Sequence, residues 1–134
     1  MIFMNIPEKY KDLLLGKNFA SVATLNPDGS PQVTPMWIDF VESTNKILVN
    51  TAKGRKKARN MVVGSKVALT VLDSTNSYRY IAIQGEIVDV SIDGAEDHIH
   101  KLAMKYWGKE NYPLSEGEVR ILVKIKPNHV HGMG

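Results

Sequence analysis

The sequence contains no cysteine in its 134 residues. Disulfide bonds, thiol nucleophiles and cysteine-ligated metal sites are therefore excluded. No apolar run approaches the roughly 20 residues that a membrane-spanning helix needs. The first five residues, Met-Ile-Phe-Met-Asn, lack the basic and apolar segments of a secretory signal peptide. Together these absences predict a cytoplasmic protein with no membrane partner.

Aromatic residues are also scarce, at 7% of the chain, and neither sign of charge dominates, because the net charge is only +3. A protein that binds single-stranded nucleic acid needs aromatic side chains for base stacking, and the basic stretch of this chain contains none. We therefore expect no nucleic-acid partner. The hydrophobic fraction of 43% is ordinary for a globular protein, and the length suits one domain, which we place over residues 1–134.

The pattern of apolar residues and turns is mostly of the β type. Alternation predicts six strands, over residues 19–25, 32–41, 46–51, 66–72, 78–92 and 119–125, with a short addition at 129–131. Helical spacing predicts helices over residues 6–15, 53–63 and 93–107. Gly85 interrupts the longest strand and predicts a bulge or bend in a curved sheet. Short antiparallel strands with a bend glycine favour a closed or nearly closed barrel over a parallel sheet.

A basic run follows the third predicted strand, with five cations among the seven residues 53–59. Lys53, Arg55, Lys56 and Lys57 occupy the first turns of the helix predicted there. Unpaired N–H groups already make this end positive, so each cation costs a few tenths to about 1 kcal/mol. A phosphate would offset that cost by accepting hydrogen bonds from the first N–H groups and from the cations. The alternative is an exposed face with hydrated charges, but the conflict with the helix dipole favours an anion site.

A second unusual segment is the strand that contains Pro35, Met36 and Trp37. Pro31 and Pro35 bracket residues that otherwise resemble a core strand, and a proline cannot donate to the ladder of a sheet. The segment is therefore an edge, a bulge or a face on which a ligand lies. Met36 and Trp37 are suited to packing on a flat aromatic ring, and the alternative for Trp37 is a place in the core.

Four histidines form two pairs with one residue between the partners, His98 with His100 and His129 with His131. Residues i and i+2 share a face on a strand but not on a helix, so only the second pair is placed to bind one metal. Without cysteine or clustered carboxylates, we expect surface histidines and no metal site. No nucleophile or acid–base pair stands out, which fits a cofactor-dependent enzyme and a pure binding module equally well.

Several segments together resemble the pyridoxamine 5′-phosphate oxidase-like split barrels, especially the branch that uses the deazaflavin coenzyme F-420. The matching pieces are Ala-Ser-Val-Ala-Thr-Leu and Asp-Gly-Ser-Pro-Gln-Val-Thr-Pro-Met-Trp within 20–37, Val-Asn-Thr-Ala-Lys-Gly-Arg-Lys-Lys-Ala-Arg-Asn-Met at 49–61, Tyr-Ile-Ala-Ile-Gln-Gly-Glu-Ile at 80–87, and Lys-Tyr-Trp-Gly with Tyr-Pro within 105–113. Their order and spacing, rather than any single motif, support the resemblance. It implies a mostly β, six-stranded antiparallel split barrel that forms a homodimer, with one FMN or F-420 per subunit at the dimer interface.

The resemblance also implies which side chains contact the cofactor. Those along the ring or the ribityl chain are Pro35, Met36, Trp37, Asn50 and Thr51. Those that bind phosphate are Lys53, Arg55, Lys56 and Lys57. Those expected to reach in from the partner subunit are Tyr78, Arg79 and Gln84, or alternatively Trp107 from the late segment.

The chemistry implied is hydride transfer between the cofactor ring and a small organic substrate, with the protein fixing the face and the distance. FMN ends in one phosphate, whereas F-420 carries a phosphodiester and an acidic tail that a longer basic groove would suit. A chain this short, without an arginine-rich substrate segment at its end, is not expected to act on pyridoxamine phosphate itself. The alternative function is a carrier that binds the cofactor without catalysis.

Overall fold

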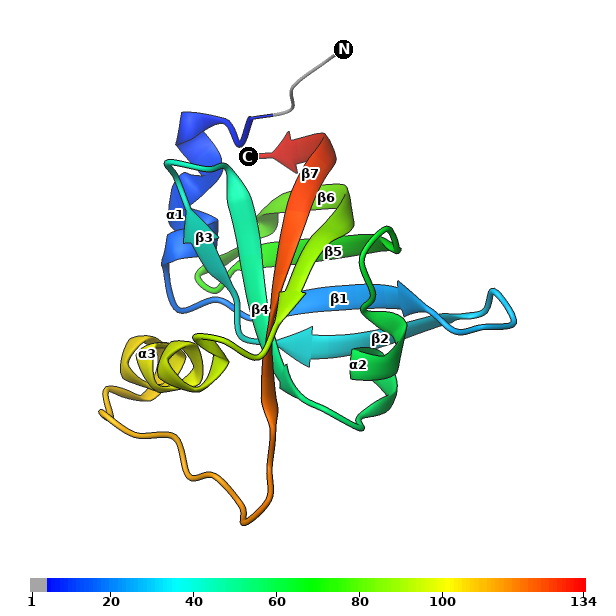
Figure 1. The fold of residues 1–134 in the computed structure, drawn as a ribbon. Helices are drawn as coiled ribbons and strands as arrows, with labels where there is room; N and C mark the ends of the chain where they lie inside the picture. The colour runs from blue at the N-terminus through cyan, green and yellow to red at the C-terminus, as the bar shows by residue number, and fades with distance from the viewer. Residues whose placement is uncertain (1–4) are drawn as a thin grey trace.

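The computed structural model describes residues 5–134 (Figure 1). Its helical elements are a 3-10 turn (Glu8–Tyr10), α1 (Lys11–Leu15), α2 (Lys56–Asn60) and α3 (Ala95–Trp107). Its strands are β1 (Ala20–Leu25), β2 (Pro31–Met36), β3 (Asp39–Val41), β4 (Lys46–Ala52), β5 (Lys66–Asp73), β6 (Asn76–Ser91) and β7 (Arg120–Met133). All seven strands form one antiparallel sheet in the order β2-β1-β5-β6-β7-β4-β3. No helix within the described residues is long and apolar enough to cross a membrane.

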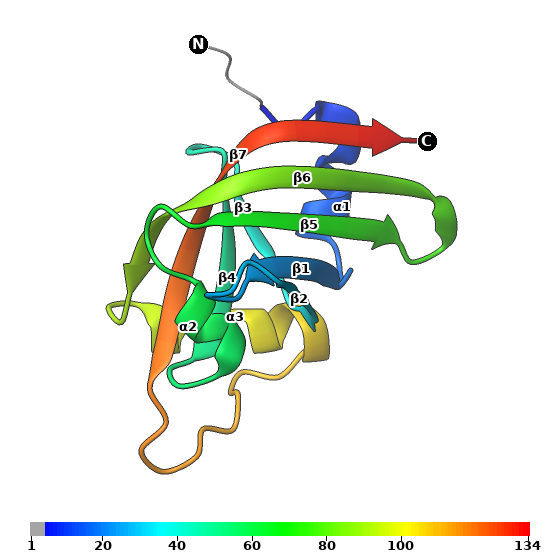
Figure 2. The ribbon, with the colours of Figure 1, turned by 90° about the vertical axis from the view of Figure 1, so that its right-hand side faces the viewer.

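The sheet coils into a split barrel because its two longest strands bend. β6 pairs with β5 and with residues 122–133 of β7, and residues 120–125 of β7 pair with β4. Figures 1 and 2 show β1, β2 and β5 running across the direction of β3 and β4. The register shifts at Gln84/Gly85, and a Cβ on Gly85 would lie 2.6 Å from the carbonyl oxygen of Lys126. The bulge expected at Gly85 is confirmed.

Residues 5–134 form seven strands where six were predicted, because the segment predicted as one strand over residues 32–41 is two. Residues 37 and 38 leave the ladder between β2 and β3. The hydroxyl of Tyr106 accepts a hydrogen bond from the N–H of Ile38 at 3.0 Å, which replaces the lost ladder bond.

The short addition predicted at 129–131 belongs to β7. Pro127 fits that strand because it pairs with Gly85 at the bulge, where no donor is required.

The interior of the barrel is filled by aliphatic side chains, and the N-terminal helical segment covers one of its ends. Leu13 and Leu14 of α1 are fully buried in this core. The ring of Tyr10 lies against Gly132, where any side chain would collide with it. The outward residues of β1, β2, β5 and β6 alternate with these core positions and form an open sheet face.

The helix predicted over residues 53–63 is much shorter in the structure. α2 has five residues, and its N-cap is Arg55, so Lys53 and Gly54 precede the helix. Lys53 continues the pairing of β4 with β7, because its N–H donates to the carbonyl of Val119 at 2.8 Å. Gly54 then turns the chain with a φ of 97°. A single turn has only a small dipole. The argument from the helix dipole is therefore wrong, and an anion site has to be judged from the cavity itself.

Candidate functional site

A cavity of about 200 Å³ lies where the end of β2, the start of α2 and α3 meet. The predicted site residues that line it are Pro35, Met36, Trp37, Asn50, Arg55, Lys57 and Trp107. The residues that sequence reasoning missed are Phe19, Ile99, Tyr112 and Arg120. Segments distant in the chain therefore converge here, from the first strand to the last.

One wall of the cavity is a cluster of stacked aromatic rings. Trp37 lies parallel to Tyr106 with centroids 5.1 Å apart, and it meets the edge of Trp107 at 4.6 Å. Trp107 in turn stacks on Tyr112 at 5.6 Å. Each such pair contributes about 0.5–1.5 kcal/mol beyond the area it buries. Because Trp107 is 49% exposed, the wall offers open aromatic surface to a ligand.

Two residues of α3, Tyr106 and Lys105, make hydrogen bonds to the segment between β2 and β3. These bonds also position Trp37, which lies in that segment. The Tyr106 hydroxyl donates to the Asn18 carbonyl at 2.7 Å while it accepts from Ile38. Lys105 donates to the carbonyls of Leu14 and Ile38 at 2.9 and 2.6 Å. Burial lowers the pKa of Lys105 to about 8, and burial raises the pKa of Tyr106 to about 12. The hydroxyl is therefore neutral and able to donate at physiological pH.

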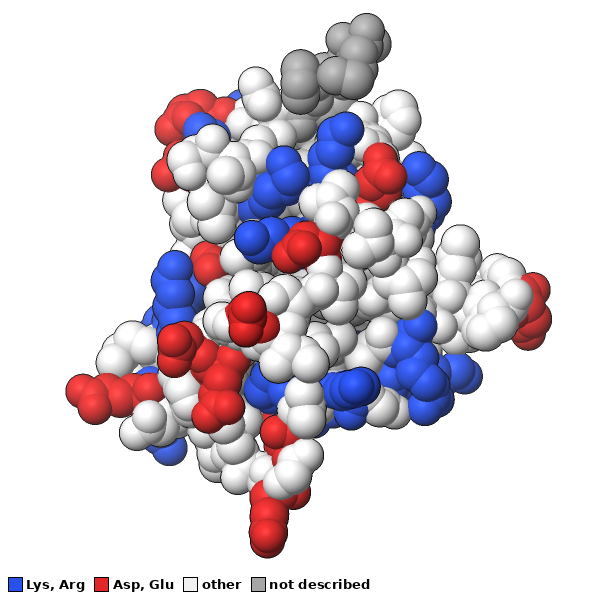
Figure 3. All heavy atoms as spheres, in the orientation of Figure 1, with Lys and Arg blue, Asp and Glu red and all other residues white. Residues whose placement is uncertain are grey.

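A cationic wall adjoins the aromatic one, because Arg120 lies 5.2 Å from the centre of the Tyr112 ring. Arg55, Lys57 and Arg120 all line the cavity, and Glu118 is the carboxylate that pairs with Arg120, at 2.8 Å. Burial lowers the pKa of Lys57, and the positive charges of Arg55 and Arg120 lower it further. Figure 3 shows Lys and Arg side chains gathered over the α2 region. Such crowding of like charges is costly without an anion between them.

A buried polar chain lies behind the cationic wall. Its members are Asp39, His98, Asn50 and Arg120, each 5–8% exposed. Asn50 accepts from Arg120 Nε at 2.9 Å and contacts His98 Nδ1 at 3.1 Å, and His98 Nε2 lies 3.2 Å from Asp39. Burial opposes ionisation of Asp39, but the bond from His98 and the charge of Lys101 outweigh it and hold its pKa below the usual range.

The prediction that His98 is a surface residue is wrong. The two α3 histidines do point apart, as expected for a helix, but His98 is buried and faces β3 and β4, whereas His100 is partly exposed. His100 Nδ1 accepts the N–H of Tyr112 at 2.9 Å and so helps to place that ring. The strand pair His129 and His131 is exposed, as predicted. Among residues 5–134 no group of three or more potential metal ligands is found.

Six predicted site residues lie outside the cavity in the single chain. Thr51 faces the core, where its hydroxyl has no partner among the described residues. Lys53 lines a separate groove with Arg59, and Lys56 is exposed. Tyr78 is 84% exposed. The other two, Arg79 and Gln84, are described below.

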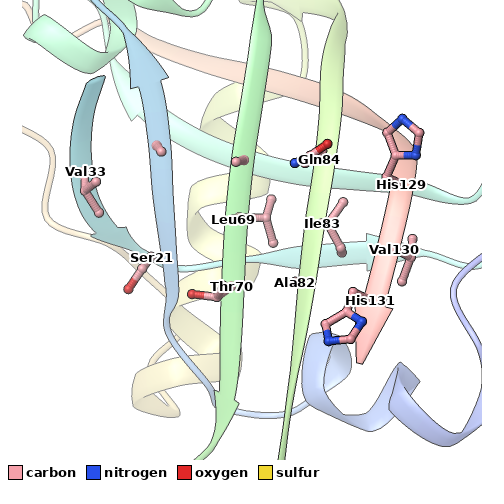
Figure 4. Close-up of a pocket in the computed structure, with 12 residues that line it drawn as sticks. Ser21, Val33, Leu69, Thr70, Ala82, Ile83, Gln84, His129, Val130 and His131 are labelled. Atoms are coloured by element: carbon pink, nitrogen blue, oxygen red, sulfur yellow. The ribbon is translucent and has the colours of Figure 1, made fainter. Parts of the chain in front are cut away.

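Two further features bear on the residues expected from a partner subunit. Gln84 lies on the outer face of the sheet, in a shallow depression of about 420 Å³ with Val33 and His131 (Figure 4). Arg79 is engaged within its own chain, because it pairs with Asp12 at 2.6 Å and with Asp73 at 3.1 Å. Arg79 is therefore a structural residue that ties α1 to the β5–β6 hairpin.

Comparisons with known proteins agree with this architecture. A solved F420 reductase is 29% identical, with 94% of this chain and 98% of that chain covered and a TM-score of 0.83. An FAD and heme binding protein from Mycobacterium smegmatis is 17% identical, with coverages of 97% and 71% and a TM-score of 0.71. General Stress Protein 26 from Bacillus anthracis is 18% identical, with coverages of 94% and 92% and a TM-score of 0.69. The last two likenesses show the fold alone.

The search of curated protein sequences found no match. The likeness to the F420 reductase confirms the resemblance to the deazaflavin branch. The family model described as pyridoxamine 5′-phosphate oxidase matches residues 6–134, which is nearly the whole chain. The chain therefore belongs to the pyridoxamine 5′-phosphate oxidase family.

Proposed function

We propose that this protein binds FMN or coenzyme F-420 in the cavity at β2, α2 and α3, and that it is an oxidoreductase acting on a small organic substrate. The observation that carries the proposal is the pairing of an open aromatic wall with a cluster of three cations. A flavin-type cofactor has the same two parts, a flat ring and an anionic phosphate. The 29% identity to an F420 reductase supports the same cofactor class.

The residues present fit such a group. Trp37 and Trp107 supply aromatic surface for a planar ring, and Arg55 and Lys57 supply charge-assisted hydrogen bonds to phosphate. An anion would also relieve the repulsion that lowers the pKa of Lys57. When bound, the cofactor supplies the hydride chemistry, and the protein binds and orients it and limits access of water.

A second copy of the chain would complete the site. The cavity of about 200 Å³ is smaller than the roughly 300–1,000 Å³ that pockets for small molecules usually enclose. The outer face of the sheet carries small and apolar groups, among them Val33 at 64% exposed, and includes Gln84. We infer a homodimer that packs through this face, with one cofactor per subunit, to which Tyr78 and Gln84 of the partner subunit would contribute.

The test is to titrate purified protein with FMN and with F-420 and to follow the visible absorption of each. We expect a saturable spectral shift at one equivalent per chain with at least one of them. If neither spectrum changes, the proposed function is wrong. Turnover of the reduced, bound cofactor by a panel of organic acceptors then separates an oxidoreductase from a carrier, because a carrier would bind the cofactor without consuming any acceptor.

A further inference from the structure

The buried chain behind the cationic wall has a defined direction of hydrogen bonding. Asn50 Nδ2 lies 2.8 Å from the carbonyl of Ala95 and 3.1 Å from His98 Nδ1, and its Oδ1 accepts from Arg120 Nε at 2.9 Å. Turning the amide over would place oxygen against the Ala95 carbonyl and N–H against the N–H of Arg120. Asn50 therefore has one orientation in which every contact joins a donor to an acceptor.

The orientation of Asn50 also determines the tautomer of His98. Because Asn50 donates to Nδ1, that nitrogen accepts, and the proton of the neutral ring is on Nε2, which donates to Asp39 at 3.2 Å. Asp39 is held in turn by the N–H of Phe40 at 2.9 Å. β3, β4, α3 and β7 are thus connected through a single line of bonds that ends at Arg120.

Arg120 is held by two of its three nitrogens. Nε donates to Asn50, Nη1 donates to Glu118 at 2.8 Å, and Nη2 makes no hydrogen bond within residues 5–134. The guanidinium lies 5.2 Å from the centre of the Tyr112 ring, at the junction between the aromatic wall and the cations of α2. Its charge is therefore fixed beside the aromatic wall, whereas Arg55 is exposed and Lys57 is half-buried.

We propose that Arg120 contacts the polar edge of the cofactor ring, and that Asp39, His98 and Asn50 are positioning residues that aim its free Nη2 at that edge. This inference rests on the proposed function. Because Nε and Nη1 already donate to Asn50 and Glu118, the guanidinium has no free pair of nitrogens for the two-bond contact that arginine makes with phosphate, and its Nη2 suits a single acceptor on the ring. A positive charge at the ring edge also stabilises the negative charge of the reduced ring.

The test compares ligands with and without phosphate. Wild type, Arg120→Gln and Arg120→Lys are titrated with FMN and riboflavin, or with F-420 and its phosphate-free deazaflavin if the wild type prefers that class. We expect Arg120→Gln to weaken both members of a pair by the same factor, about tenfold or more. A loss confined to the phosphorylated ligand would assign Arg120 to the phosphate and overturn the proposal. Lys124→Gln, which removes a cation farther along β7, is the matched control.

If Arg120→Gln does not fold, Arg120→Lys serves in its place, because it keeps the buried charge. It lacks the forked edge of the guanidinium, so we expect it to weaken the binding of both ligands by the same, smaller factor. The midpoint potential of the bound ring gives a second measurement, which should become more negative in Arg120→Gln and shift less in Arg120→Lys, because lysine keeps the positive charge. Unchanged affinity and potential in a folded variant would refute the proposal while the wild-type titration still supports cofactor binding. Failure of the wild type to bind any of the four ligands refutes the proposed function instead.

His98 separates positioning from simple stability. In His98→Gln the new amide offers an N–H to Asp39 and an oxygen to Asn50, whereas His98→Leu offers neither. We expect His98→Leu to reduce the affinity for both ligands and to lower the midpoint potential, as expected for Arg120→Gln. His98→Gln should restore most of the affinity and most of the potential. If His98→Leu changes only the melting temperature, the role of His98 is structural.

Discussion

The indole of Trp37 lies parallel to the phenol ring of Tyr106, with 5.1 Å between the centroids and 3° between the planes. Trp37 follows β2, and Tyr106 is near the end of α3, so this stack packs the segment after β2 against α3. The hydroxyl of Tyr106 also accepts a hydrogen bond from the N–H of Ile38, in the segment between β2 and β3. Tyr106 therefore both binds the backbone where β2 ends and supports the aromatic wall.

Tyr106→Phe is expected to destabilise the protein by about 1–3 kcal/mol, because it leaves the Ile38 N–H and the Asn18 carbonyl without their partner. The ring stack with Trp37 is retained in this variant. Urea denaturation measures the change in unfolding free energy. The control is Tyr80→Phe, whose hydroxyl makes no hydrogen bond within the described residues, and an equal effect of the two variants would contradict the role assigned to Tyr106.

The pH dependence of stability should report on Lys105. Its pKa is lowered to about 8 in the folded protein, against a model-compound value of 10.5, so above pH 8 the unfolded chain binds more protons. Stability linked to this group therefore rises as the pH increases from about 8 toward 10.5. The unfolding free energy of wild type should increase relative to that of Lys105→Met between pH 7.5 and 9.5. Parallel pH profiles for the two proteins would show that the lysine is not perturbed.

The cations that line the cavity should affect cofactor binding more than cations elsewhere. Arg55→Ala and Lys57→Ala are each expected to weaken FMN or F-420 binding by about tenfold or more, and to reduce its sensitivity to salt. The exposed Lys9, which is remote from the cavity residues in sequence and lines none of its walls, gives the control variant Lys9→Ala. Isothermal titration at two salt concentrations measures both effects. Equal losses in all three variants would indicate a general effect of net charge.

Gly85→Ala should disturb the bend that closes the barrel. The added Cβ would lie 2.6 Å from the carbonyl oxygen of Lys126 and 2.9 Å from Ile125, so the β6–β7 bulge must shift. We expect a loss of about 1–3 kcal/mol in unfolding free energy. Ser77→Ala, at an exposed position of the same strand, should change little, and a Gly85→Ala protein as stable as this control would show that the bulge relaxes freely.

The fold and half of the site were predictable because they depend on local patterns. Strand alternation, the glycine at the bulge and the proline-bracketed segment at 31–37 each reflect backbone constraints that are visible in a few consecutive residues. The break at Ile38 was not predictable, because its cause is a hydroxyl 68 positions away along the chain. The same limit applies to the basic run, where the sequence does not reveal that Arg55 and Lys57 face the cavity and Lys53 does not.

The residues that were missed share a physical reason. Arg120 is the first residue of β7, whose sequence resembles that of an ordinary core strand. Its burial is possible only because Asn50 and Glu118 accept hydrogen bonds from it. His98 stands between the exposed Asp97 and the buried Ile99, and its partner Asp39 is 59 positions away, so the sequence does not show this contact. Buried polar networks are built from pairs that are distant in sequence, and strand or helix periodicity does not encode them.

The most direct test of the central claim uses the chain's own fluorescence. The protein has two tryptophans, Trp37 and Trp107, and both line the candidate cavity. Titration with FMN or F-420, whichever changes its absorption on binding, should therefore quench tryptophan emission with saturation at one cofactor per chain. Trp37→Phe and Trp107→Phe should each retain part of the quenching. Cofactor binding that leaves the emission of both tryptophans unchanged would contradict the placement of the ring against this aromatic wall.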